Sequence, residues 1–365
     1  MEVAAAVVAQ FDKLKPGQKP QTRSNGDQEW TVLAGVCLVD DQNHTECITF
    51  ATGVKVVPER ARDYSHGTIV MDNHAEMLAL RAFNWWILKH IDDDKYFEAS
   101  EIAGKRRFKS KYSVQLYISE PPCGDASMSY IAQDQPAWKR RKVSEDHDRS
   151  EDATGGVARG RAQFDELGVV RTKPGRADSL LSLSKSCSDK LALKQVLGVI
   201  NSMVSSVVEP IWLEAMVVPE SKYVEQDFDR CFNRIDGHRI KVMTTDSEFS
   251  YGKHPDKVAA ANGVVGVVGG PIETLVHGVK LGSYKKNRAP NPKGQSKFCN
   301  WQMWQTYGER ISRDNPTKAQ NYCEFKESQI ERQRLKAHVQ KQLGRWVRTG
   351  SDDFPLMGTK SATMK

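Results

Sequence analysis

The chain has 365 residues, 39% of them hydrophobic, so it can bury the core of one large domain or of two ordinary ones. Its seven cysteines lack the spacing of a secreted disulfide framework, which favours a reducing compartment, and no segment approaches the ~20 apolar residues that span a bilayer. The net charge of +7 permits an anionic partner such as RNA without requiring one. Since the first residues show no basic leader, we expect a soluble protein of the nucleus and/or cytoplasm, with neither membrane nor DNA as a partner.

The first half of the chain predicts alternating strands and helices. Residues 29–40 and 45–57 are expected to be two strands joined by the turn-forming sequence DDQN, which makes a hairpin. From His74 the segment HAEMLALRAFNWWILKHI has helical spacing and a wide apolar face, preceded by the capping side chains of Asp72 and Asn73. Residues 112–119 alternate like a strand and lead into PPCGDAS, where another helix is expected to begin. This order indicates an α/β fold.

The second half begins with a change of composition. Residues 138–178 have few apolar positions and no sustained period, so we predict a disordered insertion at 138–168 within a single domain that covers residues 1–365. A helix capped by Ser184 or Ser186 is expected next, followed by strands near 211–218 and 239–244 and by a hairpin around His277 and Gly278. The amphipathic pattern at 321–347 predicts a C-terminal helical tail.

One histidine and two cysteines at predicted helix starts form a candidate zinc site. His74 lies in the first turn of a helix together with Glu76, and Cys123 follows a strand in PPCGDAS, which lacks the second cysteine of a C-x-x-C signature. Cys187, in SCSDK, also opens a predicted helix, and a helix N-terminus favours the thiolate that a metal needs. Taken singly, each residue is more often a core histidine or a buried thiol. Together they predict a His-Cys-Cys zinc set with a fourth position left for water.

The carboxylate that is left over gives this predicted site a chemistry. Bound zinc can lower the pKa of water from ~15.7 to about 7, so that hydroxide becomes available at neutral pH. Glu76 is then expected to take a proton from the water, pass one to a ring nitrogen, and help to protonate departing ammonia. The site therefore predicts hydrolytic deamination of a nucleobase.

The ordered motifs NHAEM, PPCGDAS, RTKPGRADS and SCSDK, with a helical tail that ends near GRWV, resemble the adenosine deaminases acting on tRNA, of the eukaryotic alanine-tRNA type. These enzymes are related to the double-stranded-RNA editing deaminases, and the resemblance covers nearly the whole chain outside 138–168. It implies a cytidine-deaminase-like three-layer α/β/α core with an appended C-terminal helical region. It also implies conversion of adenosine to inosine beside the anticodon of tRNA-Ala, with His74, Cys123 and Cys187 as Zn²⁺ ligands and Glu76 as the proton shuttle.

The resemblance further implies a buried inositol hexakisphosphate that fills the core of the domain. The residues that match the family's contacts to this ligand are Arg81, Lys190, Tyr322, Lys326, Lys336 and Trp346. A polyphosphate can compensate several buried cations that would otherwise be very costly. Two departures are visible, since Leu193 stands where the editing relatives carry an arginine and Asn300 replaces a lysine. Without the resemblance, the same cations would be interpreted as the solvated side of an amphipathic helix.

Basic residues in several segments are candidate RNA contacts. Lys55 lies in TGVK, which is similar to a family TGTK pattern whose lysine approaches the target nucleotide. Arg171, Lys173 and Arg176 lie in RTKPGR, where a Pro-Gly turn presents charge stiffly to a folded RNA. A second basic run carries Lys285, Lys286, Arg288, Lys293 and Lys297. Phosphate binding needs only positive charge and reach, and the run KRRK at 139–142 fits a nuclear localisation signal and a solvated linker equally well.

Three competing functions remain open at this point. One is a double-stranded-RNA adenosine editing enzyme, although the about thirty residues before the first core strand are too few for a separate double-stranded-RNA-binding domain. Another is a free-nucleoside deaminase, which would have no obvious use for the basic loops or the long tail. The third is a non-catalytic, deaminase-like RNA-binding subunit, which would have no need for Glu76.

Overall fold

The computed structural model describes residues 2–134, 158–160, 166–173, 179–311 and 317–356. Most of the predicted insertion at 138–168 therefore lies outside the described residues. Within it, Ala158–Arg159 forms the short strand β9, which pairs in parallel with β10 (Arg171–Thr172).

A mixed sheet of eight strands forms the centre of the protein. Its strands span β2 (Leu33–Asp40), β3 (Thr45–Thr52), β8 (Tyr112–Ile118), β11 (Ala215–Pro219), β12 (Lys241–Thr245), β14 (Gly263–Val267), β15 (Ile272–Val276) and β16 (Val279–Lys280). The spatial order is β12-β11-β8-β2-β3-β14-β15-β16. The strands β8, β11 and β12 are parallel, and every other neighbouring pair is antiparallel. Short pairs outside this sheet join β1 (Glu29–Trp30) to β13 (Val258–Ala259), β4 (Val54–Val56) to β5 (Asp72–His74), and β6 (Phe97–Ala99) to β7 (Arg106–Phe108).

The predicted first hairpin is confirmed, and the chain leaves the central sheet at the end of its second strand. In the turn, Oδ1 of Asp40 accepts the backbone N–H groups of Gln42 at 3.0 Å and of His44 at 2.8 Å. The predicted second strand at 45–57 is divided, because β3 ends before Gly53 and β4 leaves the sheet to pair with β5. Gly53 has a φ of 146°, and a Cβ there would lie 2.3 Å from the carbonyl oxygen of Asn73. Only glycine permits this close approach of the two strands.

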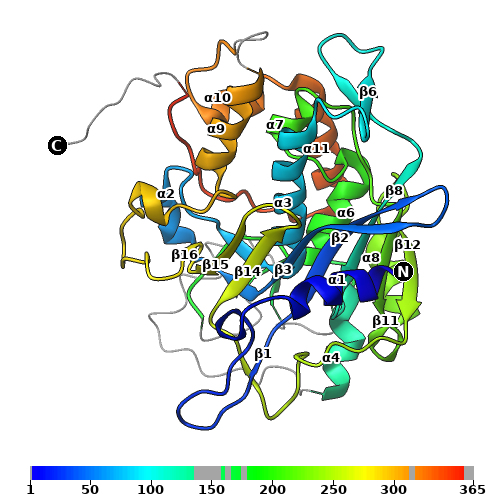
Figure 1. Cartoon of the computed structure of the whole chain (residues 1–365), viewed down its shortest axis with the longest axis vertical. Helices are drawn as coiled ribbons and strands as arrows, with labels where there is room; N and C mark the ends of the chain where they lie inside the picture. The colour runs from blue at the N-terminus through cyan, green and yellow to red at the C-terminus, as the bar shows by residue number, and fades with distance from the viewer. Residues whose placement is uncertain (1, 135–157, 161–165, 174–178, 312–316, 357–365) are drawn as a thin grey trace.

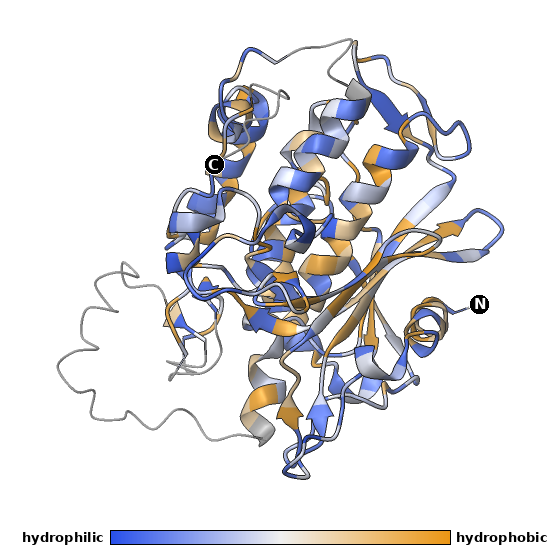
Figure 2. Ribbon diagram, turned by 60° about the vertical axis from the view of Figure 1, so that its left-hand side comes forward, coloured by the Kyte–Doolittle hydropathy of each residue, from blue (hydrophilic) through white to orange (hydrophobic). Residues whose placement is uncertain are grey.

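Helices cover both faces of the sheet (Figure 1). They span α1 (Val3–Asp12), α2 (Arg62–Ser65), α3 (Ala75–His90), α4 (Met128–Asp134), α6 (Cys187–Leu197), α7 (Ser202–Ser205), α8 (Glu225–Phe232), α9 (Asn300–Ile311), α10 (Tyr322–Glu327) and α11 (Ile330–Leu343). Alternate residues of β2 point to opposite faces: Val36 and Leu38 belong to the core under α3, whereas Leu33 and Cys37 belong to the core under α1. The predicted α/β class is confirmed, and Figure 2 shows the apolar residues gathered along the central strands and on the helices that pack there.

The C-terminal helices are present, but as two helices in place of one continuous run. The side chain of Asn321 caps α10 by accepting the N–H of Glu324 at 2.9 Å. The chain then breaks at Ser328 and Gln329 before α11 begins. The helices α1, α8 and α9 were not among those predicted. In the part of the chain that the structure describes, no helix is long and apolar enough to cross a membrane.

After α11 the chain returns across the domain as a C-terminal strap, residues 350–356. Oδ1 of Asp352 accepts the N–H of Gly67 at 2.7 Å, and Oδ2 accepts a hydrogen bond from Asn300 at 3.3 Å. The ring of Phe354 stacks on Tyr322 with 4.8 Å between centroids. The strap thus joins α9 and α10 to the loop after α2.

Candidate functional site

The three predicted metal ligands lie together where β5, the loop after β8, and α6 meet. His74 is the last residue of β5, and Cys187 is the first residue of α6. Nδ1 of His74 lies 3.6 Å from Sγ of Cys123 and 3.6 Å from Sγ of Cys187. The three ligand atoms all lie within 4.8 Å of one another, and no other group of this kind occurs among the described residues.

The residues around Cys187 hold the loop that carries Cys123. The N–H of Ser188 donates to the carbonyl of Cys123 at 3.0 Å. The backbone of Gly124, whose φ is 107°, packs closely against the side chain of Ser186, since a Cβ on Gly124 would lie 2.2 Å from Oγ of Ser186. The motifs PPCGDAS and SCSDK are therefore two halves of one packed unit, and this packing sets the spacing of the two sulfurs.

The electrostatic surroundings favour a negative sulfur at the site. The hydrogen bond with Cys187 lowers the pKa of Cys123 well below the ordinary value of a thiol, and the charges of His74 and Lys173 act in the same direction. The N–H of Cys187, at the start of α6, donates to Sγ of Cys123 at 3.4 Å. A thiolate is the form in which cysteine binds a metal.

Glu76 lies in the first turn of α3 and is only 3% exposed. Burial raises the pKa of Glu76; the nearby His74 and Lys173 oppose this rise, whereas Cys123 adds to it. The carboxyl group is thus buried beside the ligand cluster and holds a proton at a higher pH than an exposed glutamate does.

A buried chain of charges leads away from the cysteines. The ammonium of Lys173 donates to Sγ of Cys187 at 3.2 Å and to the two carboxylate oxygens of Asp72 at 2.8 and 2.9 Å. Asp72 also pairs with Lys190, which donates to Oγ of Ser184 at 2.7 Å. Burial alone would raise the pKa of Asp72, but Lys173 and Lys190 hold it well below its ordinary value. Burial would likewise lower the pKa of Lys173, and Asp72 and Cys187 reverse that effect.

The structure corrects two of the predicted RNA contacts. Arg171 is 1% exposed and Lys173 is 2% exposed, so neither side chain can reach a phosphate at the surface. The guanidinium of Arg171 donates to the carbonyl of Gly160 at 3.2 Å, and Lys173 belongs to the buried charge chain. A lysine beside a turn can be exposed to solvent or buried against a carboxylate, and the sequence pattern is the same in both cases. Lys55 is exposed on β4, and Arg176 lies outside the described residues.

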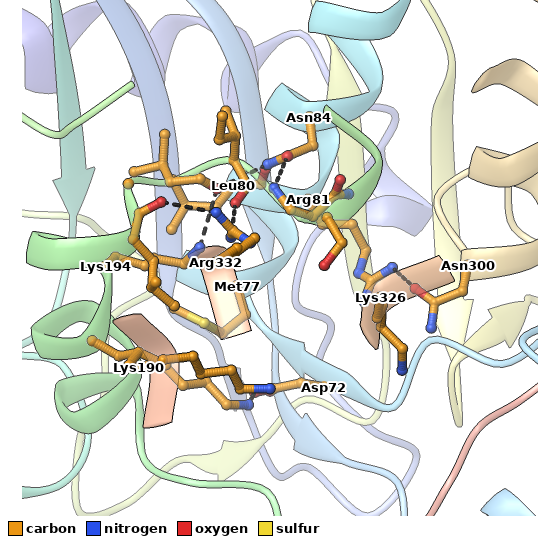
Figure 3. A pocket seen from close by; sticks show the side chains of 18 of the residues that line it. Asp72, Met77, Leu80, Arg81, Asn84, Lys190, Lys194, Asn300, Lys326 and Arg332 are labelled. Carbon is orange, nitrogen blue, oxygen red and sulfur yellow. Dashed lines mark hydrogen bonds and ion pairs between the residues drawn. The ribbon is translucent and has the colours of Figure 1, made fainter. Parts of the chain in front are cut away.

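A cavity of about 350 Å³ lies at the far end of this charge chain (Figure 3). The cationic side chains that line it come from α3, α6, α10 and α11: Arg81, Lys190, Lys194, Lys326, Arg332 and Lys336. The one carboxylate in the lining is Asp72, which Lys173 and Lys190 already engage. The cavity therefore gathers far more positive than negative charge.

Several of these cations have only neutral partners in the lining. Nη1 of Arg81 donates to Oδ1 of Asn300 at 2.9 Å, and Nζ of Lys194 donates to the carbonyl of Val199 at 3.1 Å. Burial lowers the pKa of Lys194 to about 7, with the charge of Arg332 acting in the same direction, and burial lowers the pKa of Arg332 to about 10. Such a cluster is unfavourable unless an anion compensates it.

Comparison with known proteins decides the family. The adenosine-deaminase (editase) domain matches residues 49–350, which is most of the chain. The chain belongs to the adenosine-deaminase (editase) domain family. It is 34% identical over 382 residues to the tRNA-specific adenosine deaminase 1 of Schizosaccharomyces pombe, covering 96% of this chain and 95% of that protein. The protein of the same name from Saccharomyces cerevisiae is 32% identical, with coverage of 96% and 93%. The double-stranded RNA-specific editase Adar of Drosophila melanogaster is 23% identical over 64% of this chain and 35% of that protein.

The range matched by the editase domain contains the ligand cluster, Glu76 and the cations of the cavity. Of the six residues expected to contact a polyphosphate, the cavity is lined by Arg81, Lys190, Tyr322, Lys326 and Lys336. Trp346 does not line it, and its ring centroid lies 5.6 Å from Nζ of Lys185. Leu193 and Asn300 also line the cavity.

Sequence reasoning missed two cations of the editase-domain cavity, Lys194 and Arg332. Lys194 follows Lys190 by four residues on α6, and Arg332 precedes Lys336 by four residues on α11. Residues four apart lie on the same side of a helix. Pairs of cations at this spacing on two helices were the signal that could have found them.

Proposed function

We propose that this protein catalyses the hydrolytic deamination of adenosine to inosine in tRNA. The observation that carries the proposal is the convergence of His74, Cys123 and Cys187, with the carboxyl group of Glu76 buried beside them. The relatives that match nearly the full chain are named tRNA-specific adenosine deaminases, which supports tRNA as the substrate.

The side chains of the cluster fit Zn²⁺. One imidazole nitrogen and two thiols are ligand types that zinc prefers, and three protein ligands leave a position for water. The lowered pKa of Cys123 provides a sulfur already suited to a metal. His74, Cys123 and Cys187 would hold the ion, which when bound makes a water molecule acidic near neutral pH.

Glu76 is the proton carrier of the proposed reaction. One of its carboxylate oxygens accepts a proton from the attacking water and delivers it to N1 of adenine as the water oxygen bonds to C6. The second proton of that water then passes through Glu76 to the 6-amino group, the bond between C6 and that nitrogen breaks, and ammonia leaves. Water and adenosine thus give inosine and ammonia. The raised pKa of Glu76 suits a group that must both accept and return a proton.

The Glu76→Ala variant tests this assignment. It should retain zinc and tRNA binding while inosine formation falls by at least ~10²-fold, the usual contribution of a general acid–base group. Zinc content, equilibrium tRNA binding and sequencing of the reacted RNA supply the readouts. A Glu76→Ala protein that still converts adenosine at the wild-type rate would refute the role.

We further propose that the substrate is tRNA-Ala and that the target lies beside its anticodon, as the resemblance implies. Purified protein is incubated with unmodified tRNA-Ala and, separately, with a perfect RNA duplex, and both are sequenced. Conversion of one adenosine in tRNA-Ala alone supports the proposal. Conversion of the duplex favours double-stranded-RNA editing, and RNA binding without conversion by the zinc-loaded protein favours a non-catalytic subunit.

We propose that Lys55 contacts the substrate. It is exposed on β4 opposite Asn73, and the adjacent pair in the same ladder is Val54 and His74. If Lys55 contacts one phosphate, Lys55→Ala should weaken binding to all RNAs alike. It should also reduce the slope of the logarithm of the binding constant against the logarithm of the salt concentration by about one. Unchanged salt dependence would remove Lys55 from the interface. Arg176 remains a candidate contact of the same kind, with the same test.

We also propose that the protein acts in the nucleus and/or cytoplasm as a single domain that carries an insertion at 138–168. The free cysteines support a reducing compartment. Fractionation of cells that express the tagged chain tests the location, and recovery of the protein in the secretory pathway would contradict it. Limited proteolysis tests the insertion, since cleavage should fall first at 138–168 and leave the remaining chain associated.

We propose that the cavity holds inositol hexakisphosphate. The excess of cations, the neutral partners of Arg81 and Lys194, and the size of the space support a polyanion there. Lys194 and Arg332 add positive charge to a cavity that Leu193 also lines, at the position where the resemblance implies an arginine in the editing relatives. Mass spectrometry of the small molecules released from denatured protein should find about one polyphosphate per chain, a stoichiometry set by one polyanion per cation cluster. Folded, active protein that releases none would overturn the proposal.

A further inference from the structure

An exposed aromatic pair lies at the β15–β16 hairpin, beside α2 in Figure 1. His277 is at the tip of the hairpin and Tyr284 is in the loop that follows. Their ring centroids lie 4.2 Å apart with 31° between the planes. Tyr284 is 44% exposed and His277 is exposed as well. These two residues, here called the ring platform, belong to none of the hydrophobic clusters of the described residues.

The backbone beneath the ring platform is held in place. His277 has a φ of 51° and Gly278 a φ of 78°, and the carbonyl of Gly278 accepts the N–H of Val70 at 2.9 Å. The following loop is closed at its base, where a Cβ on Gly294 would lie 2.5 Å from Cβ of Ser283. A platform that is already ordered loses little conformational entropy when it binds a partner.

Four cations follow Tyr284 in the same loop. Lys285, Lys286, Arg288 and Lys293 are all exposed, and in the described part of the chain none of them pairs with a carboxylate. The nearby carboxylate of Glu273 is occupied by Oγ of Ser296 at 2.7 Å and by Lys280 at 3.2 Å. Rings interleaved with unpaired cations are the combination that binds single-stranded nucleic acid, because bases stack on the rings and phosphates pair with the cations.

The ring platform is connected to the segment that precedes the metal ligand His74. Burial lowers the pKa of His277, and the charge of Lys55 acts in the same direction. Lys55 is opposite Asn73, the residue before His74. Val70, which holds the hairpin tip, belongs to the segment that leads into β5. A nucleotide on the ring platform would therefore neighbour one whose base has entered the site.

We infer that His277 and Tyr284 stack an unpaired base that flanks the target adenosine, while the surrounding cations hold the adjoining phosphates. The inference rests on the proposed function and deepens it, because it makes the substrate an RNA loop with an unstacked neighbour beside the target. A base inside a regular duplex is already stacked on both faces and offers no free face to the rings.

Tyr284→Ala tests the inference, with Tyr284→Phe as the variant that keeps the ring. Leu281→Ala, in the same hairpin and 55% exposed, is the matched control. His277→Asn removes the other ring but suits the left-handed backbone. Binding is measured in the Glu76→Ala background, so that the RNA stays unconverted, on an RNA loop that carries 2-aminopurine at each position next to the target.

Loss of base stacking should weaken RNA binding by roughly 5- to 150-fold in Tyr284→Ala. It should also restore the 2-aminopurine fluorescence that stacking quenches at one flanking position. Tyr284→Phe and Leu281→Ala should match the parent protein. Equal binding and equal quenching in Tyr284→Ala and the parent would overturn the inference, as would weakened binding with no quenching by the parent at any flanking position.

The same variants separate this inference from the proposed function. If the otherwise unaltered chain makes no inosine in any tRNA but quenches the flanking base through Tyr284, the proposed function fails and the ring platform stands. If it makes inosine and Tyr284→Ala leaves kcat/KM and RNA affinity unchanged, the ring platform fails alone.

Discussion

Replacing Asp72 by asparagine should destabilise the protein because it removes the charge that two lysines share. The side chains of Asp72 and Lys173 are 13% and 3% exposed, whereas that of Lys190 is 24% exposed. Removing one partner of a buried ion pair costs ~3–5 kcal/mol, since the other charge remains buried without compensation. In Asp72→Asn this cost falls mainly on Lys173, the more deeply buried of the two lysines.

A double-mutant cycle separates this electrostatic cost from a change of packing. Lys173→Met leaves Asp72 paired with Lys190, so we expect a smaller loss of about 1–2 kcal/mol. The double variant contains no uncompensated ammonium at position 173. Its loss of stability should therefore be about 1–3 kcal/mol smaller than the sum of the two single losses.

Urea unfolding at pH 7.5, with zinc in excess in every sample, measures the free energy of unfolding of each variant. The control is Asp94→Asn, whose carboxylate pairs with Arg106 at 2.8 Å but is 89% exposed. Its effect should stay below ~0.5 kcal/mol. If the losses from Asp72→Asn and Lys173→Met add to within ~0.5 kcal/mol, the two residues are not coupled and the reasoning is wrong.

Further predictions concern pH, metal and backbone. The pKa of Lys194 is about 7 in the folded protein, below the ~10.4 of an unfolded lysine, so the unfolded chain binds more protons between these values. In protein stripped of polyanions, the free energy of unfolding should therefore rise with pH from 7 to 10, by at most ~1.4 kcal/mol per pH unit. Urea titrations at several pH values measure this slope, and Lys194→Met should make it smaller. The same slope in both proteins would contradict the lowered pKa of Lys194. Metal analysis should find that Cys187→Ser has lost its zinc. The control variant Cys299→Ser changes a buried thiol outside the cluster and should retain zinc. Unchanged zinc in Cys187→Ser would exclude Cys187 as a ligand. Gly124→Ala should lower the unfolding temperature and the zinc content together, because its Cβ would lie 2.2 Å from Oγ of Ser186; a variant with wild-type values of both would show that the loop can shift.

The ligand cluster could be predicted from sequence because each ligand is tied to a local signal. His74 directly precedes α3, Cys187 is the first residue of α6, and Cys123 follows two prolines in the loop after β8. Such short patterns depend only on neighbouring residues, so the elements that they predict also occur in the folded protein. What they do not contain is the distance between the three, which depends on the contact of Ser188 with Cys123 and on the close approach at Gly124.

Burial of charge was the property least accessible from sequence. Arg171 and Lys173 lie in a polar, turn-containing segment that is typical of a solvated loop, and yet both are buried. Lys173 is kept ionised by Asp72, which is 101 residues away in sequence. The cavity has the same origin, since Arg81 and Arg332 line one space from α3 and α11, two helices that are far apart in the sequence. The pattern of residues within one segment does not show which residues of another segment it will contact.

The C-terminal strap also has a consequence for how the protein reaches its native state. Asp352 and Gly67 are hydrogen-bonded across 285 residues of sequence, so this contact cannot form until Asp352 has left the ribosome. Proteins whose contacts span long sequence separations fold slowly, because the entropy of closing the loop is lost before the contact is gained. During synthesis, the loop after α2 and the apolar surface that Phe354 covers would remain open to solvent. Production of this enzyme should accordingly depend on chaperones that shield this surface, and removal of the C-terminal strap should trap the protein in that unfinished state.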